Sequence, residues 1–83
     1  MTTAQQEAFA QMTAIAAALL RAGGTATAAV IAAETGLPLP LVTRRLTQNG
    51  AAAIRVERRY FARIGDGWKV TVHGLALTTG QKT

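Results

Sequence analysis

The alternation of apolar and polar positions along the chain predicts three helices followed by a β-hairpin. Over residues 4–22 the apolar side chains recur at the spacing of a helix that packs on a core. This stripe consists of Phe9, Met12, Ala16, Leu19 and Leu20. The remaining faces are rich in alanine, which has the highest helix propensity, and Gly23-Gly24 ends the helix. The small-residue faces fit either an ordinary helix surface or a dimer contact.

A second helix is expected over residues 27–35. The hydroxyl of Thr25 or Thr27 would accept a hydrogen bond from an exposed amide of its first turn. Gly36 follows the helix, and glycine readily adopts the left-handed conformation that ends helices. This stretch therefore predicts a short helix that stops at a tight glycine turn.

A third helix is expected over residues 40–49. It starts in a proline-containing segment, where proline is tolerated because the first amides of a helix have no helical partner, and it stops at an Asn-Gly pair. Val42 and Leu46 share one face of this helix, whereas Thr43 and Arg44 lie on the opposite face. A helix, a glycine turn and a helix with a basic outer face together predict a helix-turn-helix.

A two-stranded hairpin is expected over residues 54–73. Along the first strand, apolar residues alternate with charged ones. The apolar residues are Ile54, Val56, Tyr60, Ala62 and Ile64. Arg58 and Phe61 break this alternation, which a β-bulge near Arg58 would explain. Gly65-Asp66-Gly67 is a hairpin-turn signal, and the return strand would run from Trp68 to Val72.

The fold class predicted by these elements is α+β, mostly α, in a single domain over residues 1–83. Residues 75–77 would pack back on the core, and residues 78–83 would form a loose tail. The chain has 83 residues and therefore buries a modest core, so a homodimer is expected. It contains no cysteine, which fits a reducing cytoplasm. The longest apolar run, residues 14–20, is too short for a membrane span, and no membrane association is expected.

The net charge of +5 is distributed unevenly. Residues 1–43 carry one arginine against two glutamates, whereas residues 44–69 carry seven basic residues against Glu57 and Asp66. Basic charge concentrated in one half of a chain is typical of proteins that bind a polyanion. The alternative is a solvated, arginine-rich face that only aids solubility.

The segment that runs from Ile31 to Leu37, followed by Val42 to Leu46, resembles the helix-turn-helix of small bacterial and phage winged-helix transcription regulators. The small alanine, the glycine four residues later and the Thr-Arg-Arg-Leu sequence fall where that family has them. The resemblance covers about 20 residues closely and the hairpin more loosely. One departure is the apolar first turn of the third helix, which is usually polar in the family.

The resemblance implies a sequence-specific regulator that binds double-stranded DNA, with the third helix in the major groove and the hairpin as an arginine-rich wing. Thr43, Arg44 and Gln48 are the candidate base readers, because arginine pairs with guanine and glutamine with adenine. The candidate contacts to phosphates or the minor groove are Arg45, Arg55, Arg58, Arg59, Arg63 and Lys69. Such a protein would act in the cytoplasm as a homodimer, as a repressor or by recruiting polymerase.

No catalytic, cofactor-binding or metal site is expected. The chain has one histidine, His73, and its four carboxylates are scattered over different predicted elements. No phosphate-binding glycine loop and no metal-ligand spacing occurs. The sequence therefore predicts a binding protein rather than an enzyme.

Two other binding functions remain open. A winged helix can also serve as a protein-interaction module, with Leu39, Leu41, Phe61 and the alanine face of the first helix contacting a polymerase or another regulator. The basic hairpin would alternatively bind RNA, with Tyr60, Phe61 and Trp68 as the candidate stacking residues. Binding to a duplex, to a single strand or to neither distinguishes the three functions.

Overall fold

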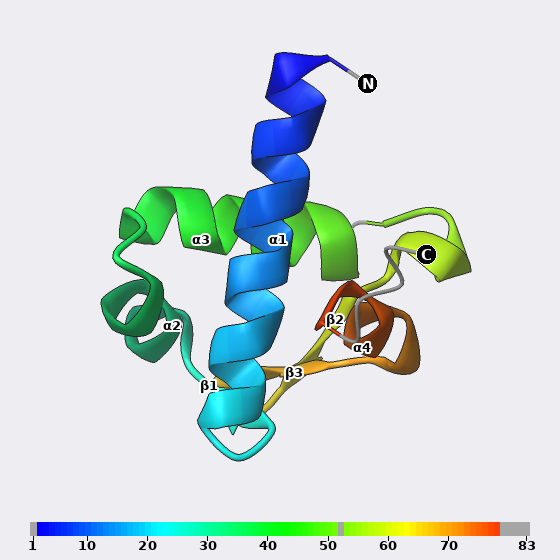
Figure 1. Ribbon diagram of the computed structural model, residues 1–83. Coiled ribbons are helices and arrows are strands. Elements are labelled where there is room, and N and C mark those ends of the chain that lie inside the picture. The colour runs from blue at the N-terminus through cyan, green and yellow to red at the C-terminus, as the bar shows by residue number, and fades with distance from the viewer. Residues whose placement is uncertain (1, 52, 79–83) are drawn as a thin grey trace.

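The computed structural model describes residues 2–51 and 53–78, and in these residues the chain is an α+β protein that is mostly helical (Figure 1). Four α-helices are combined with a three-stranded antiparallel sheet. The elements are α1 (Thr3–Arg21), β1 (Thr25–Ala26), α2 (Ala28–Thr35), α3 (Leu39–Leu46), β2 (Phe61–Ile64), β3 (Gly67–Val70) and α4 (Val72–Thr78). The predicted fold class is confirmed at this level, and β1 and α4 are additions to the expected elements.

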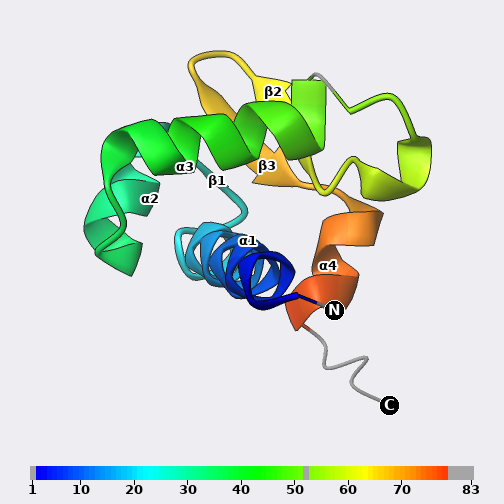
Figure 2. The ribbon, with the colours of Figure 1, turned by 90° about the horizontal axis from the view of Figure 1, so that it is seen from above.

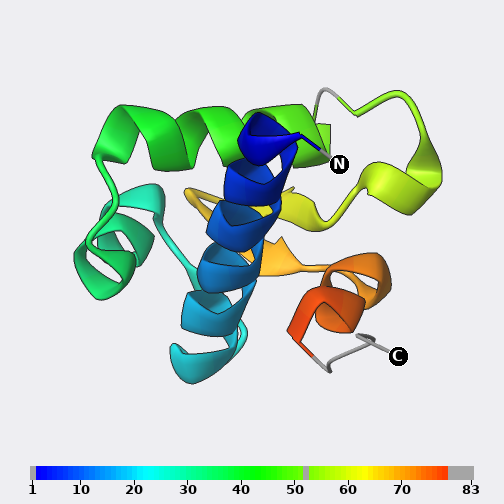
Figure 3. The same ribbon diagram turned by 45° about the horizontal axis from the view of Figure 1, so that its top comes forward.

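Helix α1 begins one residue before its predicted start and is closed at its N-terminus by two reciprocal hydrogen bonds. Thr2 Oγ1 accepts from Gln5 N at 3.1 Å, and Gln5 Oε1 accepts from Thr2 N at 2.8 Å. The N-terminal half of α1 projects past α3, as Figures 1 and 3 show. Phe9 lies in this projecting half and is 40% exposed.

The buried face of α1 is rotated relative to the predicted stripe. It consists of Ile15, Ala16, Ala18 and Leu19. The prediction is correct for Ala16 and Leu19 and wrong for Phe9 and Leu20, which are both 40% exposed. The buried residues of α1 all lie in its C-terminal half, so Phe9 is too far toward the N-terminus to reach the core, and Leu20 lies outside the buried face.

The core lies between α1, α2, α3 and the sheet. Viewed from above, α3 runs across α1, which is seen end-on (Figure 2). The fully buried large side chains are Phe61, Ile15, Leu19, Ile31, Leu46 and Val42. Val42 and Leu46 are thus the inner face of α3, as predicted, and they hold its other face toward solvent.

The sheet has the strand order β1-β3-β2. In β1, Thr25 is opposite Lys69 and Ala26 is opposite Trp68. A Cβ on Gly67 would lie 2.8 Å from the carbonyl oxygen of Ala26, so glycine allows this close approach of the two strands. Thr25 therefore belongs to a strand, and Thr27 is the residue that caps α2.

The hairpin is shorter than predicted. Strands β2 and β3 are joined by the two-residue turn Gly65-Asp66, which confirms the predicted turn. Residues 54–60, in contrast, do not continue β2: they form a loop that contains a 3₁₀ turn at Val56–Arg58. The predicted strand over this stretch is wrong because β3 ends at Val70 and leaves no partner strand opposite it.

Helix α4 replaces the end of the predicted return strand. It begins at Val72, packs against α1 and buries Leu77. His73 consequently lies in a helix and not at the end of a strand. Gly74 allows the close approach of α4 to the carbonyl oxygen of Tyr60. Of the predicted tail, residues 79–83 lie outside the described residues.

Candidate nucleic-acid interface

The turn between α2 and α3 is built from local hydrogen bonds. Thr27 Oγ1 accepts from Val30 N at 3.3 Å and caps α2, and Gly36 ends it in the left-handed conformation with a φ of 77°. Thr35 Oγ1 donates to the carbonyl oxygen of Ile31 at 2.8 Å and accepts from Leu37 N at 3.2 Å. The geometry of the turn is therefore set by the residues from which it was predicted.

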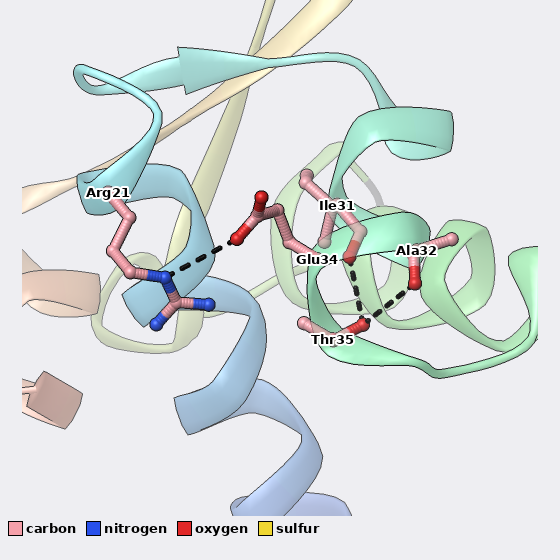
Figure 4. A network of polar contacts seen from close by, with 5 residues as sticks. All are labelled: Arg21, Ile31, Ala32, Glu34 and Thr35. Atoms are coloured by element: carbon pink, nitrogen blue, oxygen red, sulfur yellow. Dashed lines mark hydrogen bonds and ion pairs between the residues drawn. The ribbon is translucent and has the colours of Figure 1, made fainter.

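Helix α2 is also tied to the end of α1. Arg21 Nε lies 3.5 Å from Glu34 Oε1, and both side chains are about half exposed (Figure 4). An exposed pair of this kind contributes only about 0–1 kcal/mol to the free energy of unfolding. The pair therefore adds little to the packing of α2, and it places the carboxylate of Glu34 beside Arg21 of α1.

Helix α3 presents a polar outer face composed of Thr43, Arg44 and Gln48. All three residues are exposed, whereas Val42 and Leu46 are buried, and the helical period places Arg44 opposite these two core residues. Gln48 lies just beyond the α-helical part, in a wider helical turn at Thr47–Ala51. The three candidate base readers are therefore all exposed, two on α3 and one in the turn that follows it.

Arg45 does not belong to this outer face. It is partly buried, and its Nε donates to Gln11 Oε1 of α1 at 3.1 Å. The backbone carbonyl of Arg45 in turn accepts from Asn49 Nδ2 at 3.1 Å. Arg45 thus connects α3 to α1, and no pattern in the sequence indicates Gln11 as its partner.

Three of the predicted wing arginines lie in the loop between α3 and β2. We call residues 53–60 the arginine loop; it contains Arg55, Arg58 and Arg59, which are all exposed. The assignment of these residues to a hairpin strand is wrong, because β3 provides no partner for this stretch. The loop leaves the C-terminal end of α3, whereas the hairpin turn lies at the other end of β2 (Figure 2). The predicted basic wing is therefore two separate basic surfaces.

The second basic surface is the hairpin itself, with Arg63 and Lys69. Arg63 is folded back on its own hairpin: its Nε donates to the carbonyl oxygen of Gly65 at 3.0 Å, and its guanidinium carbon lies 5.3 Å from the centroid of the Trp68 ring. Lys69 is exposed on β3. Lys69 is the hairpin cation for which the structure records no such internal contact among the described residues.

The arginine loop, in contrast, adjoins the outer face of α3. One shallow cleft is lined by Gln48, Asn49, Ala53, Ile54, Arg55 and Arg58. Gln48, from the turn that follows α3, and two loop arginines thus line the same cleft. The sequence pattern missed this juxtaposition, because it placed Ile54 and Val56 on the inner face of a strand, whereas they are 91% and 60% exposed.

Two of the aromatic residues considered for RNA stacking are buried. Phe61 is 1% exposed and Trp68 is 5% exposed, so neither presents a ring face to a base. Phe61 is also excluded as a surface contact for a protein partner. Tyr60 is half-buried and packs against the core.

Among the described residues, no group of three or more His, Asp or Glu side chains lies close enough to hold a metal ion. No described helix has the length and apolar character needed to cross a membrane. Comparison of the chain with protein-family models, with curated proteins and with solved structures found no match. The function is therefore inferred from the geometry of the chain itself.

Proposed function

We propose that the chain is a winged helix-turn-helix domain that binds double-stranded DNA in a sequence-specific manner and regulates transcription. The observation that carries the proposal is the outer face of α3, where Thr43, Arg44 and Gln48 are exposed together while Val42 and Leu46 anchor the helix in the core. The order of α2, the Gly36 turn and α3, followed by the β2–β3 hairpin, supports this assignment.

In this proposal α3 lies in the major groove and its outer face reads bases. The guanidinium of Arg44 donates two hydrogen bonds to O6 and N7 of guanine, and the amide of Gln48 pairs with adenine. Thr43 contacts either a base edge or a thymine methyl group. The apolar first turn, with Leu39 47% exposed, limits base reading to the middle and the end of the helix.

Phosphate contacts come from the basic residues on either side of this face. Arg55, Arg58 and Arg59 lie beyond the C-terminal end of α3, and Lys69 lies on the hairpin. Such contacts supply much of the affinity and hold the register of the protein on the duplex, but they carry little sequence information. A domain of this kind, acting in the cytoplasm without a catalytic centre or a cofactor, regulates by occupying its site and blocking or recruiting polymerase.

The test is fluorescence anisotropy with a random 25-base-pair duplex and with the matched single strands, over about 50 to 200 mM salt. The proposal expects duplex binding in the micromolar range that weakens steeply with salt, and weaker binding of the single strands. Selection of duplexes from a random pool then identifies the preferred site. Absence of duplex binding at the lowest salt concentration contradicts the proposal.

A second candidate function is a protein-interaction module, which one observation favours. A shallow, mostly apolar groove runs along α1. It is lined by Gln5, Ala8, Phe9 and Met12 of α1 and by Arg58 of the arginine loop. Phe9 is 40% exposed and lies on the half of α1 that projects from the fold. If the duplex does not bind, this groove is the surface to test with a polymerase or another regulator.

A further inference from the structure

The arginine loop carries two large apolar side chains in an exposed position. Ile54 is 91% exposed and Val56 is 60% exposed. Single exposed apolar residues are normal on a protein surface. Here, however, two β-branched residues lie two positions apart on a segment that extends beyond the C-terminal end of α3 (Figures 2 and 3). Such a pair is expected to become buried when another molecule binds at this surface.

The loop is braced by hydrogen bonds on the chain to either side of these residues. Tyr60 N donates to the carbonyl oxygen of Asn49 at 2.8 Å and so ties the last residue of the loop to the helical turn after α3. Within the loop, Arg59 Nε donates to the carbonyl oxygen of Ala53 at 3.0 Å. Thr71 Oγ1 also donates to the carbonyl oxygen of Arg59. The exposed position of Ile54 and Val56 is therefore held by the fold, and a bound partner meets a preorganised segment.

The charge around the two apolar residues indicates the chemistry of the partner. Positions 54–59 contain three arginines and one glutamate, so the segment is cationic overall. A partner surface with a negative potential matches this net positive charge better than a wholly apolar surface does. A DNA minor groove offers both kinds of contact: a negative potential that attracts arginine, and stacked base steps between which isoleucine and similar side chains insert.

The position of the loop indicates how it meets the same DNA as α3. Ile54, Arg55 and Arg58 line one cleft with Gln48, which lies in the wider turn just after α3. With α3 in the major groove, a segment that continues from its C-terminal end lies against the adjoining backbone. The neighbouring minor groove is then the next surface within its reach.

We infer that the arginine loop is a minor-groove wedge, in which Ile54 and Val56 insert at a base step and the loop arginines contact the flanking phosphates. This inference rests on the proposed DNA-binding function and deepens it. An inserted wedge unstacks the step and bends the duplex away from the minor groove, by about 20–90° in proteins that act in this way. The loop, rather than the hairpin, then supplies the second DNA contact of the domain.

The test compares DNA bending by the whole chain and by its variants on one selected duplex labelled at both ends for energy transfer. The double variant Ile54→Ala/Val56→Ala removes the wedge and keeps every arginine. Val72→Ala is the matched control, because Val72 is 74% exposed on α4 and lies outside the loop. Circular dichroism melting curves verify that all the proteins are folded.

The wild-type chain is expected to shorten the distance between the labels, and the control variant to do the same. The loop variant is expected to bind about tenfold more weakly, which is about 1.4 kcal/mol of binding free energy, and to leave the duplex straight. A minor-groove ligand such as netropsin is expected to compete with the wild type more strongly than with the loop variant. If the loop variant binds and bends like the wild type, the wedge is wrong while DNA binding stands. If the wild type binds no duplex, the proposed function fails, and the wedge with it.

Discussion

The two adjacent arginines on α3 have different surroundings. At the scale of single residues, one is therefore a candidate for DNA recognition and the other contributes to the stability of the fold. Arg44 is exposed on the outer face, whereas Arg45 donates through Nε to Gln11 on α1. The same substitution at neighbouring positions therefore tests two different interactions. Each serves as the control for the other.

Arg44→Ala is expected to reduce discrimination between the selected duplex and a random one by about 1–3 kcal/mol, because alanine cannot donate the two hydrogen bonds that arginine gives to a base. Arg45→Ala is expected to leave that discrimination nearly unchanged and to lower the free energy of unfolding by about 0.5–1.5 kcal/mol, the usual contribution of one hydrogen bond. Competition binding and urea denaturation measure the two quantities. An equal decrease of discrimination in both variants would contradict the assignment of the outer face.

A second residue with a specific role is Gly50, where the chain leaves the helical turn after α3. A Cβ at this position would lie 2.8 Å from the carbonyl oxygen of Phe61 and 3.2 Å from Cζ3 of Trp68. Gly50→Ala is expected to lower the free energy of unfolding by about 1–3 kcal/mol, because the strand and the ring must move. Thr47→Ala, at an exposed position of the same turn, is the control in the same denaturation experiment. Equal stability of the two variants would show that the site adjusts without cost.

At the scale of elements, the arginine loop and the hairpin are expected to contribute differently to DNA binding. Arg58→Gln should reduce the slope of log K against log salt by about 0.9, for the one phosphate that the variant no longer neutralises. Arg63→Gln should change the slope less, because the Arg63 guanidinium already lies on Trp68 and its Nε donates to Gly65. Titrations at several salt concentrations compare the variants. If Arg63→Gln changed this slope more than Arg58→Gln did, the hairpin and not the arginine loop would make the principal phosphate contacts.

Helices α1, α2 and α3 were predictable to within a few residues because their ends depend on local signals. Gly36 and Thr27 act on the backbone next to them, and the periodicity of α3 places Val42 and Leu46 inside without reference to other elements. Strands depend on partners that are distant in the sequence. The two residues of β1 have no pattern of their own, and they form a strand only because β3 lies beside them.

The same dependence explains the errors in the candidate site. The alternation of Ile54, Val56 and Tyr60 is a genuine strand pattern, but it lacks a partner strand because the chain turns into α4 at Val72. Among the predicted base readers, Thr43 and Arg44 required only the helical period of α3. The position of Gln48 and Arg58 in one cleft was not predictable, because it depends on the path of a loop.

At the scale of the whole molecule, the projecting half of α1 is the surface that fits the expected homodimer. It carries Phe9 at 40% exposure and a single charged residue, Glu7. A twofold dimer would present two α3 helices to half-sites about 34–36 Å apart on one face of the duplex. The proposed dimer therefore requires both α1 helices near the symmetry axis.

Phe9→Asp is expected to shift the chain from dimer to monomer and to weaken binding to a palindromic duplex more than binding to a half-site. Analytical ultracentrifugation measures the oligomeric state, and anisotropy measures the two affinities. Val30→Asp is the control for the oligomeric state, because Val30 is 46% exposed on α2 and lies outside α1. A wild-type chain that stays monomeric at concentrations of about 100 times the Kd for DNA would contradict the dimer.

The pairing of β1 with β3 also has a consequence for the order in which the chain folds. Thr25 pairs with Lys69, so the two partners are separated by 69 − 25 = 44 positions, whereas the contacts of α2 with α3 are local. Closing a long loop costs entropy before the interaction it forms can compensate. The three helices α1, α2 and α3 are therefore expected to associate first, and β1 to be captured last, when the hairpin is complete. On a ribosome, this final step waits until Lys69 has left the exit tunnel.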